Sequence, residues 1–148
     1  MDVIDSAKAA QVWERVQGRT PEENREAGLG ELIAREWESA GTYLLLSRQV
    51  QGRASALLRK LSEQEGAHVA CLKGIYTLIT GKRPGFTGVK PGHEHLHSAL
   101  RRCYGQQMQR LACYESRCND PEYGHIFAQL AQQERQHCHI VLEVLGML

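Results

Sequence analysis

The sequence lacks the features that would place the protein in a membrane or on nucleic acid. Its apolar runs are too short to cross a bilayer, and the acidic start (residues 1–5) lacks the apolar core of a signal peptide. The formal net charge of the 148 residues is only +1, and the Lys and Arg residues are scattered over what we expect to be outer helix faces. We therefore expect a cytoplasmic protein that binds neither membranes nor nucleic acid.

Cysteine pairs of the Cys-x-x-Cys type are also missing. The chain has five cysteines, an odd number at irregular spacing: Cys71, Cys103, Cys113, Cys118 and Cys138. Such usage fits a reducing compartment, in which thiols act as small core residues.

No segment has the alternation of a strand, whereas helical periodicity is strong. The pattern predicts four long helices, over about residues 29–51, 53–80, 93–118 and 121–145. We expect an all-α fold with one domain, the bundle of residues 29–148. Residues 1–28 form a separate amphipathic segment in this interpretation. Its apolar face is too small to stand alone, so we expect it to pack on the bundle or on a partner subunit.

The connections between these helices constrain how the helices are arranged. The turns near Gly52 and Asn119 are short and predict two antiparallel hairpins. The Gly/Pro-rich segment 81–92 is different, because twelve residues reach about 40 Å when extended, close to the ~42 Å length of a 28-residue helix. It can cross the whole bundle and make helices two and three parallel, as in ferritin-like bundles. An up-down-up-down bundle is also physically allowed, but we favour the crossover.

Two of these helices carry ionisable side chains in the middle of an apolar stripe. The inward positions of the second helix are Leu58, Leu61, Glu65, His68, Leu72, Ile75 and Ile79. Those of the fourth helix are Phe127, Leu130, Glu134, His137, Val141, Val144 and Leu148. Burying a lone carboxylate or imidazole costs several kcal/mol unless it is paired or bound to a metal ion. The two stripes therefore predict one shared polar site inside the bundle.

The two hairpins also match as an internal repeat. The Glu-x-x-His motif at residues 65–68 recurs 69 residues later at 134–137, and Glu36 aligns with Gln107 at a similar spacing. The corresponding residues lie at similar distances from the hairpin turns, which places them at one depth in the bundle. The predicted layer contains Glu36, Glu65, His68, Gln107, Glu134 and His137.

The Glu-x-x-His spacing is weak evidence by itself, because the chain contains it four times. The pairs Glu94/His97 and Glu122/His125 fall beside the apolar stripes, whereas the other two pairs lie on them. Glu and His three residues apart share a helix face and can bind one metal ion. A metal-free hydrogen-bond network of buried carboxylates and imidazoles is the alternative. Two pairs at the depth of a further glutamate favour the metal site.

Residues 93–97 formally match the His-Glu-x-x-His signature of zinc peptidases. The match begins immediately after Pro91-Gly92, in the first turn of a predicted helix instead of its middle. No strand framework for a substrate is evident either. We interpret these residues as a surface histidine cluster.

At its two inward motifs the chain resembles the rubrerythrin branch of the ferritin-like di-iron carboxylate proteins. The likeness spans about residues 29–148. The family pattern has one Glu on each of two helices and Glu-x-x-His on each of the other two. The resemblance implies a four-helix bundle with two metal ions in its core.

The resemblance also implies a ligand set for these two ions. Glu65 and Glu134 would bridge the ions. Glu36 and His68 would complete one of them, and His137 with a residue of the third helix would complete the other. The ions would be iron, with manganese or a single metal as the alternative.

Two tyrosines and one substitution refine this implied site. Tyr43 and Tyr114 would hydrogen-bond ligand carboxylates, although ordinary core aromatics are an equally good interpretation. The third helix offers Gln107 where the family has Glu, and a neutral amide is the weaker ligand. We therefore expect an asymmetric site, with the metal at Glu36 and His68 held more tightly.

By resemblance, the protein is a non-haem di-iron enzyme that reduces peroxide or oxidises iron with oxygen or peroxide. A manganese catalase would have the same ligand layout. Rubredoxin-type cysteine pairs are missing, so electrons would come from a separate donor protein. A storage or structural protein with a degenerate site at Gln107 is the alternative from another class. The family also implies a homodimer, with Trp13 as a candidate interface residue.

Overall fold

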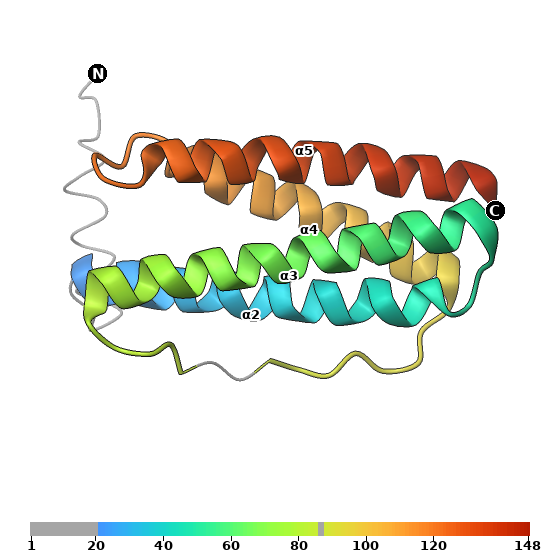
Figure 1. The fold of residues 1–148 in the computed structure, drawn as a ribbon, viewed down its shortest axis with the longest axis horizontal. Helices are drawn as coiled ribbons and strands as arrows, with labels where there is room; N and C mark the ends of the chain where they lie inside the picture. The colour runs from blue at the N-terminus through green and yellow to red at the C-terminus, as the bar shows by residue number, and fades with distance from the viewer. Residues whose placement is uncertain (1–20, 86–87) are drawn as a thin grey trace, which may run out of the picture.

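The computed structural model describes residues 21–85 and 88–148. This part contains four helices, α2 (Pro21–Ser47), α3 (Gly52–Thr80), α4 (Leu96–Ser116) and α5 (Gly124–Met147), and no strand (Figure 1). The prediction of an all-α four-helix bundle is confirmed. None of the helices in the described ranges is both long and apolar enough to span a membrane. Our expectations for residues 1–20, including the role of Trp13, lie outside the described residues.

Helix α2 begins at Pro21, earlier than the predicted start near residue 29. The helix continues through Gly28 and Gly30, although glycine inside a helix is destabilising. Gly28 has a packing role, because a Cβ there would lie 2.6 Å from the Arg117 side chain. The Arg117 guanidinium lies 5.7 Å from the centre of the Phe127 ring. The glycine therefore makes room for a long side chain that covers this end of the bundle.

The helix ends follow the turn residues of the sequence. Gly81 ends α3 in the left-handed conformation with φ 70°, so the helix stops at the predicted residue 80. Gly52 also has a positive φ, 65°, which residues with a Cβ rarely adopt. The second hairpin turn is fixed differently: the Asp120 carboxylate accepts hydrogen bonds from the amides of Glu122 and Tyr123 at 3.0 and 2.9 Å. Residues 121–123 form a turn, so α5 begins at Gly124 and not at the predicted Pro121.

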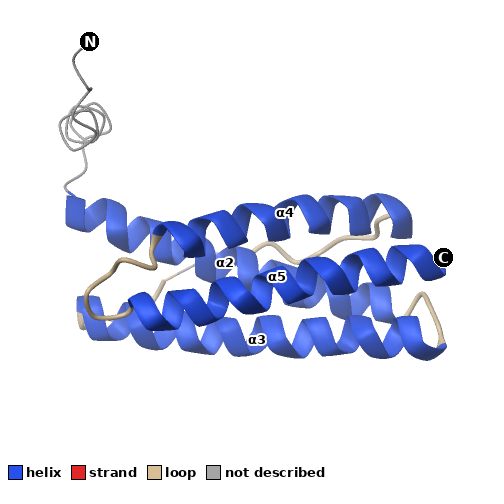
Figure 2. Cartoon of the chain, turned by 90° about the horizontal axis from the view of Figure 1, so that it is seen from above, coloured by secondary structure: helices blue, strands red, loops and turns tan. Residues whose placement is uncertain are grey.

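The connection between α3 and α4 is described at residues 81–85 and 88–95, and both parts lie along the length of the bundle. In Figure 1 it leaves the end of α3 on one side and reaches the start of α4 at the opposite end, so α3 and α4 are parallel. Helix α2 packs on α3 and α4 packs on α5, and the two hairpins meet through α3 with α5 and α2 with α4 (Figure 2). The predicted crossover is therefore confirmed.

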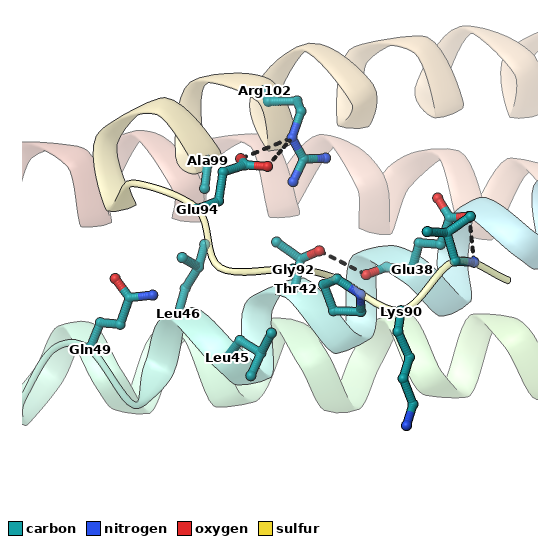
Figure 3. Close-up of a pocket in the computed structure, with 12 residues that line it drawn as sticks. Glu38, Thr42, Leu45, Leu46, Gln49, Lys90, Gly92, Glu94, Ala99 and Arg102 are labelled. Atoms are coloured by element: carbon teal, nitrogen blue, oxygen red, sulfur yellow. Dashed lines mark hydrogen bonds and ion pairs between the residues drawn. The ribbon is translucent and has the colours of Figure 1, made fainter.

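The second half of the crossover is held against the bundle. The amide of Val89 donates a hydrogen bond to Glu38 Oε1 at 3.1 Å, and a Cβ at Gly41 would lie 3.2 Å from Pro91. A surface pocket of about 210 Å³ lies between this segment, α2 and α4 (Figure 3). Glu94 and Arg102 form an ion pair at its edge. This pocket is lined by none of the predicted metal ligands.

The bundle core consists of two apolar clusters. The first includes Leu29, Ile33, Leu72, Phe127 and Leu130. The second includes Leu46, Leu58, Leu61, Leu100 and Val141. Along each helix the predicted polar residues lie between the members of these clusters. The polar layer is therefore enclosed by hydrocarbon at both ends, which strengthens every electrostatic interaction inside it.

Candidate metal centre

The structure brings the six predicted layer residues together in the bundle interior. They come from all four helices and are almost completely buried: Glu36, Glu65, His68, Gln107, Glu134 and His137. The depth argument from the hairpin turns therefore placed them correctly. Burial of this many ionisable groups in one layer is rare without a compensating charge.

Two Glu-x-x-His motifs form the centre of this layer. One ligand atom from each of Glu65, His68, Glu134 and His137 can be chosen so that all four lie within 4.8 Å of one another. Within each helix the glutamate and histidine are three residues apart and therefore share a face. The imidazole rings of the two motifs stack, with their centroids 5.3 Å apart. This group can hold a metal ion.

Each histidine is oriented by a glutamine from the opposite motif. His68 Nε2 lies 2.5 Å from Gln133 Oε1, and His137 Nε2 lies 2.6 Å from Gln64 Oε1. An amide oxygen only accepts hydrogen bonds, so both Nε2 atoms donate and both Nδ1 atoms face the carboxylates. Glutamine was not identified from the sequence, although it precedes the glutamate in both motifs. Such hydrogen bonds commonly fix metal-binding histidines.

The two buried tyrosines cross between the hairpins. The Tyr114 hydroxyl donates to Glu36 Oε1 at 2.6 Å, as expected for a residue that orients a ligand carboxylate. Tyr43 differs from the expectation, because its hydroxyl accepts a hydrogen bond from the Gln107 amide at 2.8 Å. The same amide donates to Glu65 Oε1 at 2.5 Å. The Tyr43 hydroxyl therefore pairs with the amide of Gln107, at the position where the family has a carboxylate.

Arg110 is a further residue of this site that our sequence reasoning missed. We expected arginines on outer faces, but Arg110 is only 1% exposed. Its Nη2 lies 3.1 Å from Glu65 Oε1, and its Nε lies 3.6 Å from Glu36 Oε1 and 3.8 Å from Glu134 Oε1. Nη2 also donates to the Ser39 hydroxyl at 3.1 Å. One feature of the sequence could have indicated that Arg110 faces the layer: it lies three residues after Gln107 and therefore on the same helix face.

These contacts shift the pKa values of the buried groups in different directions. Burial and repulsion from Glu65 raise the pKa of Glu36 well above its ordinary value. Burial also acts to raise the pKa of Glu65, but the Arg110 charge and several hydrogen bonds hold it well below that value. Burial lowers the pKa of His68, yet hydrogen bonds to Glu134, Glu36 and Glu65 outweigh this and raise it to about 12. Without a metal ion, His68 is therefore a cation beside ionised Glu65.

Several buried acceptors of the layer find no hydrogen-bond donor within the described ranges. One oxygen of each carboxylate is in this position, and so are two further atoms: Glu36 Oε2, Glu65 Oε2, Glu134 Oε2, Gln107 Oε1 and His137 Nδ1. A buried polar group without a partner costs about 1–3 kcal/mol. Carboxylate oxygens and imidazole nitrogens are ligands of divalent transition-metal ions, so a bound ion would give such atoms a partner.

The competing motifs lie at the surface. His93, His95 and His97 are exposed, and α4 begins after the first two of them. Glu122 and His125 are exposed as well. The interpretation of the His-Glu-x-x-His match as a surface histidine cluster agrees with these positions.

Comparisons with protein-family models, curated proteins and solved structures found no match for this chain. The site is therefore defined by its own geometry: it is a buried cluster of carboxylates and histidines that can hold a metal ion.

Proposed function

We propose that this protein binds iron or manganese in the core of its bundle and uses the ion to reduce hydrogen peroxide. The observation that carries the proposal is the buried group of Glu65, His68, Glu134 and His137, whose ligand atoms lie within 4.8 Å of one another. Five buried acceptors of the same layer have no hydrogen-bond donor among the described residues. The same ligand pattern is the basis of the resemblance to rubrerythrin. A bound iron or manganese ion supplies one-electron redox chemistry that protein side chains alone lack.

The reaction needs electrons from outside the site. Reducing one hydrogen peroxide to two waters takes two electrons and two protons, so a separate donor protein would deliver the electrons one at a time. The protein's own groups would orient the ligands. Gln64 and Gln133 hold the imidazoles, and Tyr114 holds Glu36. This orientation keeps ligand atoms facing the centre and limits rearrangement during electron transfer.

A small polar cavity offers hydrogen peroxide a route to the site. It has a volume of about 190 Å³ and is lined by Arg35, Glu38, Gln106, Gln109 and Arg110. Arg110 lines this cavity and also contacts the three carboxylates. A molecule as small and polar as hydrogen peroxide fits such a space, whereas a larger organic substrate does not.

A metal-holding protein without turnover is the second candidate. Two residues beside Glu65 favour it, the neutral Gln107 and the cationic Arg110. A neutral amide is a weaker ligand than a carboxylate, and a nearby positive charge repels a second metal ion. A manganese catalase differs from both candidates because it would decompose hydrogen peroxide without any electron donor.

The test combines metal analysis with peroxide consumption. We expect the anaerobically purified protein to contain iron or manganese, and the metal-loaded protein to consume hydrogen peroxide when a chemical reductant is present. Glu134→Gln should abolish both properties. Glu122→Gln is the matched control, because it changes an exposed glutamate of a second Glu-x-x-His motif.

Three results distinguish the candidates. Peroxide consumption that depends on both metal and reductant supports the peroxidase. Consumption without a reductant favours the catalase reaction, and bound metal without consumption favours metal holding. A properly folded wild-type protein that takes up neither iron nor manganese would contradict the proposal itself.

A further inference from the structure

We infer that the core holds one divalent metal ion and that the Arg110 guanidinium occupies the place of a second cation. This inference rests on the proposed metal binding and departs from the two-ion site that the sequence pattern implies. It follows from the position of Arg110, from the charges of the layer and from the convergence of both motifs on one point.

Arg110 already serves as the shared counter-ion of all three carboxylates. Its nitrogens lie 3.1 Å from Glu65 Oε1, 3.6 Å from Glu36 Oε1 and 3.8 Å from Glu134 Oε1. The other oxygen of each carboxylate, Oε2, has no hydrogen-bond partner among the described residues. A guanidinium is permanently charged. The arginine therefore faces the Oε1 atoms, whereas the Oε2 atoms accept no hydrogen bond from the described residues and can bind an ion.

The charges of the layer match one divalent ion. Three ionised carboxylates carry three negative charges and Arg110 carries one positive charge, so the ligand group with neutral histidines has a net charge of −2. One divalent cation neutralises it. Two would leave +2 buried between apolar clusters, where an uncompensated charge costs several kcal/mol. A family-type site with four carboxylates and no arginine balances two ions instead.

The ligand geometry also suits a single ion. Ligand nitrogens or oxygens lie about 2.1 Å from a metal, so opposite ligands of one ion are about 4.2 Å apart. The selected atoms of Glu65, His68, Glu134 and His137 lie within 4.8 Å of one another, which requires only a small closure around one ion. In two-ion sites the metals are themselves about 3.5–4 Å apart. The motifs of both hairpins can thus bind the same ion.

The experiment counts metal ions per chain in the full-length protein. The metal-free protein is loaded anaerobically with excess Fe²⁺ or, separately, Mn²⁺, desalted, and measured by elemental analysis and native mass spectrometry. We expect one ion per chain, and the electron paramagnetic resonance spectrum of an isolated Mn²⁺ ion. Two exchange-coupled ions would give a different spectrum, so this readout does not depend on activity.

A double variant tests the role of the guanidinium directly. Gln107→Glu with Arg110→Met restores a fourth carboxylate and removes the arginine, so we expect two ions per chain. The matched control is Gln129→Glu with Arg101→Met, which makes the same charge change at exposed positions and should leave one ion bound. Circular dichroism establishes that each variant is folded.

The outcomes separate this inference from the proposed function. Two ions per chain in the wild-type protein, whether equally or unequally tight, overturn the inference and leave the metal-binding function intact. No bound ion in the wild-type protein overturns the function. A folded double variant that still binds a single ion shows that Arg110 does not exclude the second one. If the double variant does not fold, the wild-type count and spectrum decide by themselves.

Discussion

The two hairpins of the bundle have the same design but different charges. His68 and His137 each bond to a glutamine of the opposite motif. The difference lies in the partner helices, where α2 carries Glu36 and Ser39 and α4 carries Gln107 and Arg110 at the matching positions. Arg110 and Ser39, 71 residues apart, contact each other across the layer. One half of the repeat thus supplies a carboxylate, and the other half supplies a cation.

This difference shows how a repeated fold can hold an asymmetric site. The apolar stripe, the hairpin turns and the motif spacing are shared, so both halves reach the same depth. At two matching positions α4 differs from α2, with Gln107 in place of Glu36 and Arg110 in place of Ser39, and these differences change the charge of the layer. Changes in the charged and hydrogen-bonding residues of the layer therefore test how far the two halves differ.

Removing the arginine should have the largest effect. Arg110→Met leaves three buried carboxylates without their shared counter-ion, which typically costs about 3–5 kcal/mol. We expect this loss in the free energy of unfolding of the metal-free protein, measured by urea titration. Arg101→Met, at an exposed position of the same helix, should change it by less than about 0.5 kcal/mol. A metal-free variant as stable as the wild type would show that the guanidinium is not needed to balance the carboxylates.

Metal affinity should rise with pH because protons of the first hairpin compete with the ion. The pKa of His68 is raised to about 12 and that of Glu36 lies well above its ordinary value. We expect the ion to displace a proton from His68 near neutral pH. At pH values below the raised pKa of Glu36, it should displace a second proton from that carboxyl group. Each displaced proton strengthens binding about tenfold per pH unit. Calorimetry in buffers of different ionisation enthalpy counts the released protons, and a pH-independent affinity would contradict this coupling.

The two glutamines should contribute equally to metal binding. Gln64→Ala and Gln133→Ala each remove the acceptor that holds one imidazole, which commonly weakens metal binding about 10–100-fold. Equal losses in a competition titration are expected if both histidines bind the same ion. Gln132→Ala changes an exposed neighbour and should have no effect. A large loss in one variant alone would assign the ion to one hairpin.

The two tyrosines should contribute unequally to stability. Tyr114→Phe removes the donor to Glu36 Oε1, and hydrogen bonds to charged groups are worth about 1.5–3 kcal/mol, so this loss is expected at a pH at which Glu36 is ionised. Tyr43→Phe removes an acceptor of the Gln107 amide, which still donates to Glu65, so about 1 kcal/mol is expected. Urea unfolding of both variants at one pH gives this comparison. The reverse order would mean that the bond to Gln107 is the stronger one.

Much of this site could be predicted from the sequence because its signals are local and periodic. Residues three or four apart share a helix face, so the motifs at 65–68 and 134–137 had to face the same way as the leucines around them. Short turns fixed the pairing within each hairpin, and equal distances from the turns fixed the common depth. Glu36 and Gln107 were placed in the layer by the same reasoning.

The interpretation failed where a residue type has a strong preference that the tertiary structure overrides. Arginine is almost never fully buried unless it is paired, so Arg110 was assigned to the surface with the other basic residues. Its partners come from α2, α3 and α5, and no local pattern joins them. The contact of Tyr43 with an amide, instead of a carboxylate, was missed for the same reason.

Helical periodicity and turn chemistry were enough to predict four helices, two hairpins and the depth at which the ionisable residues meet. The charge balance of the layer could be read only from the packed bundle. The Coulomb interaction depends on distances between atoms of different helices, and those distances exist only after the two hairpins have packed together. The contacts of the Arg110 guanidinium with three carboxylates are therefore visible only in the folded structure.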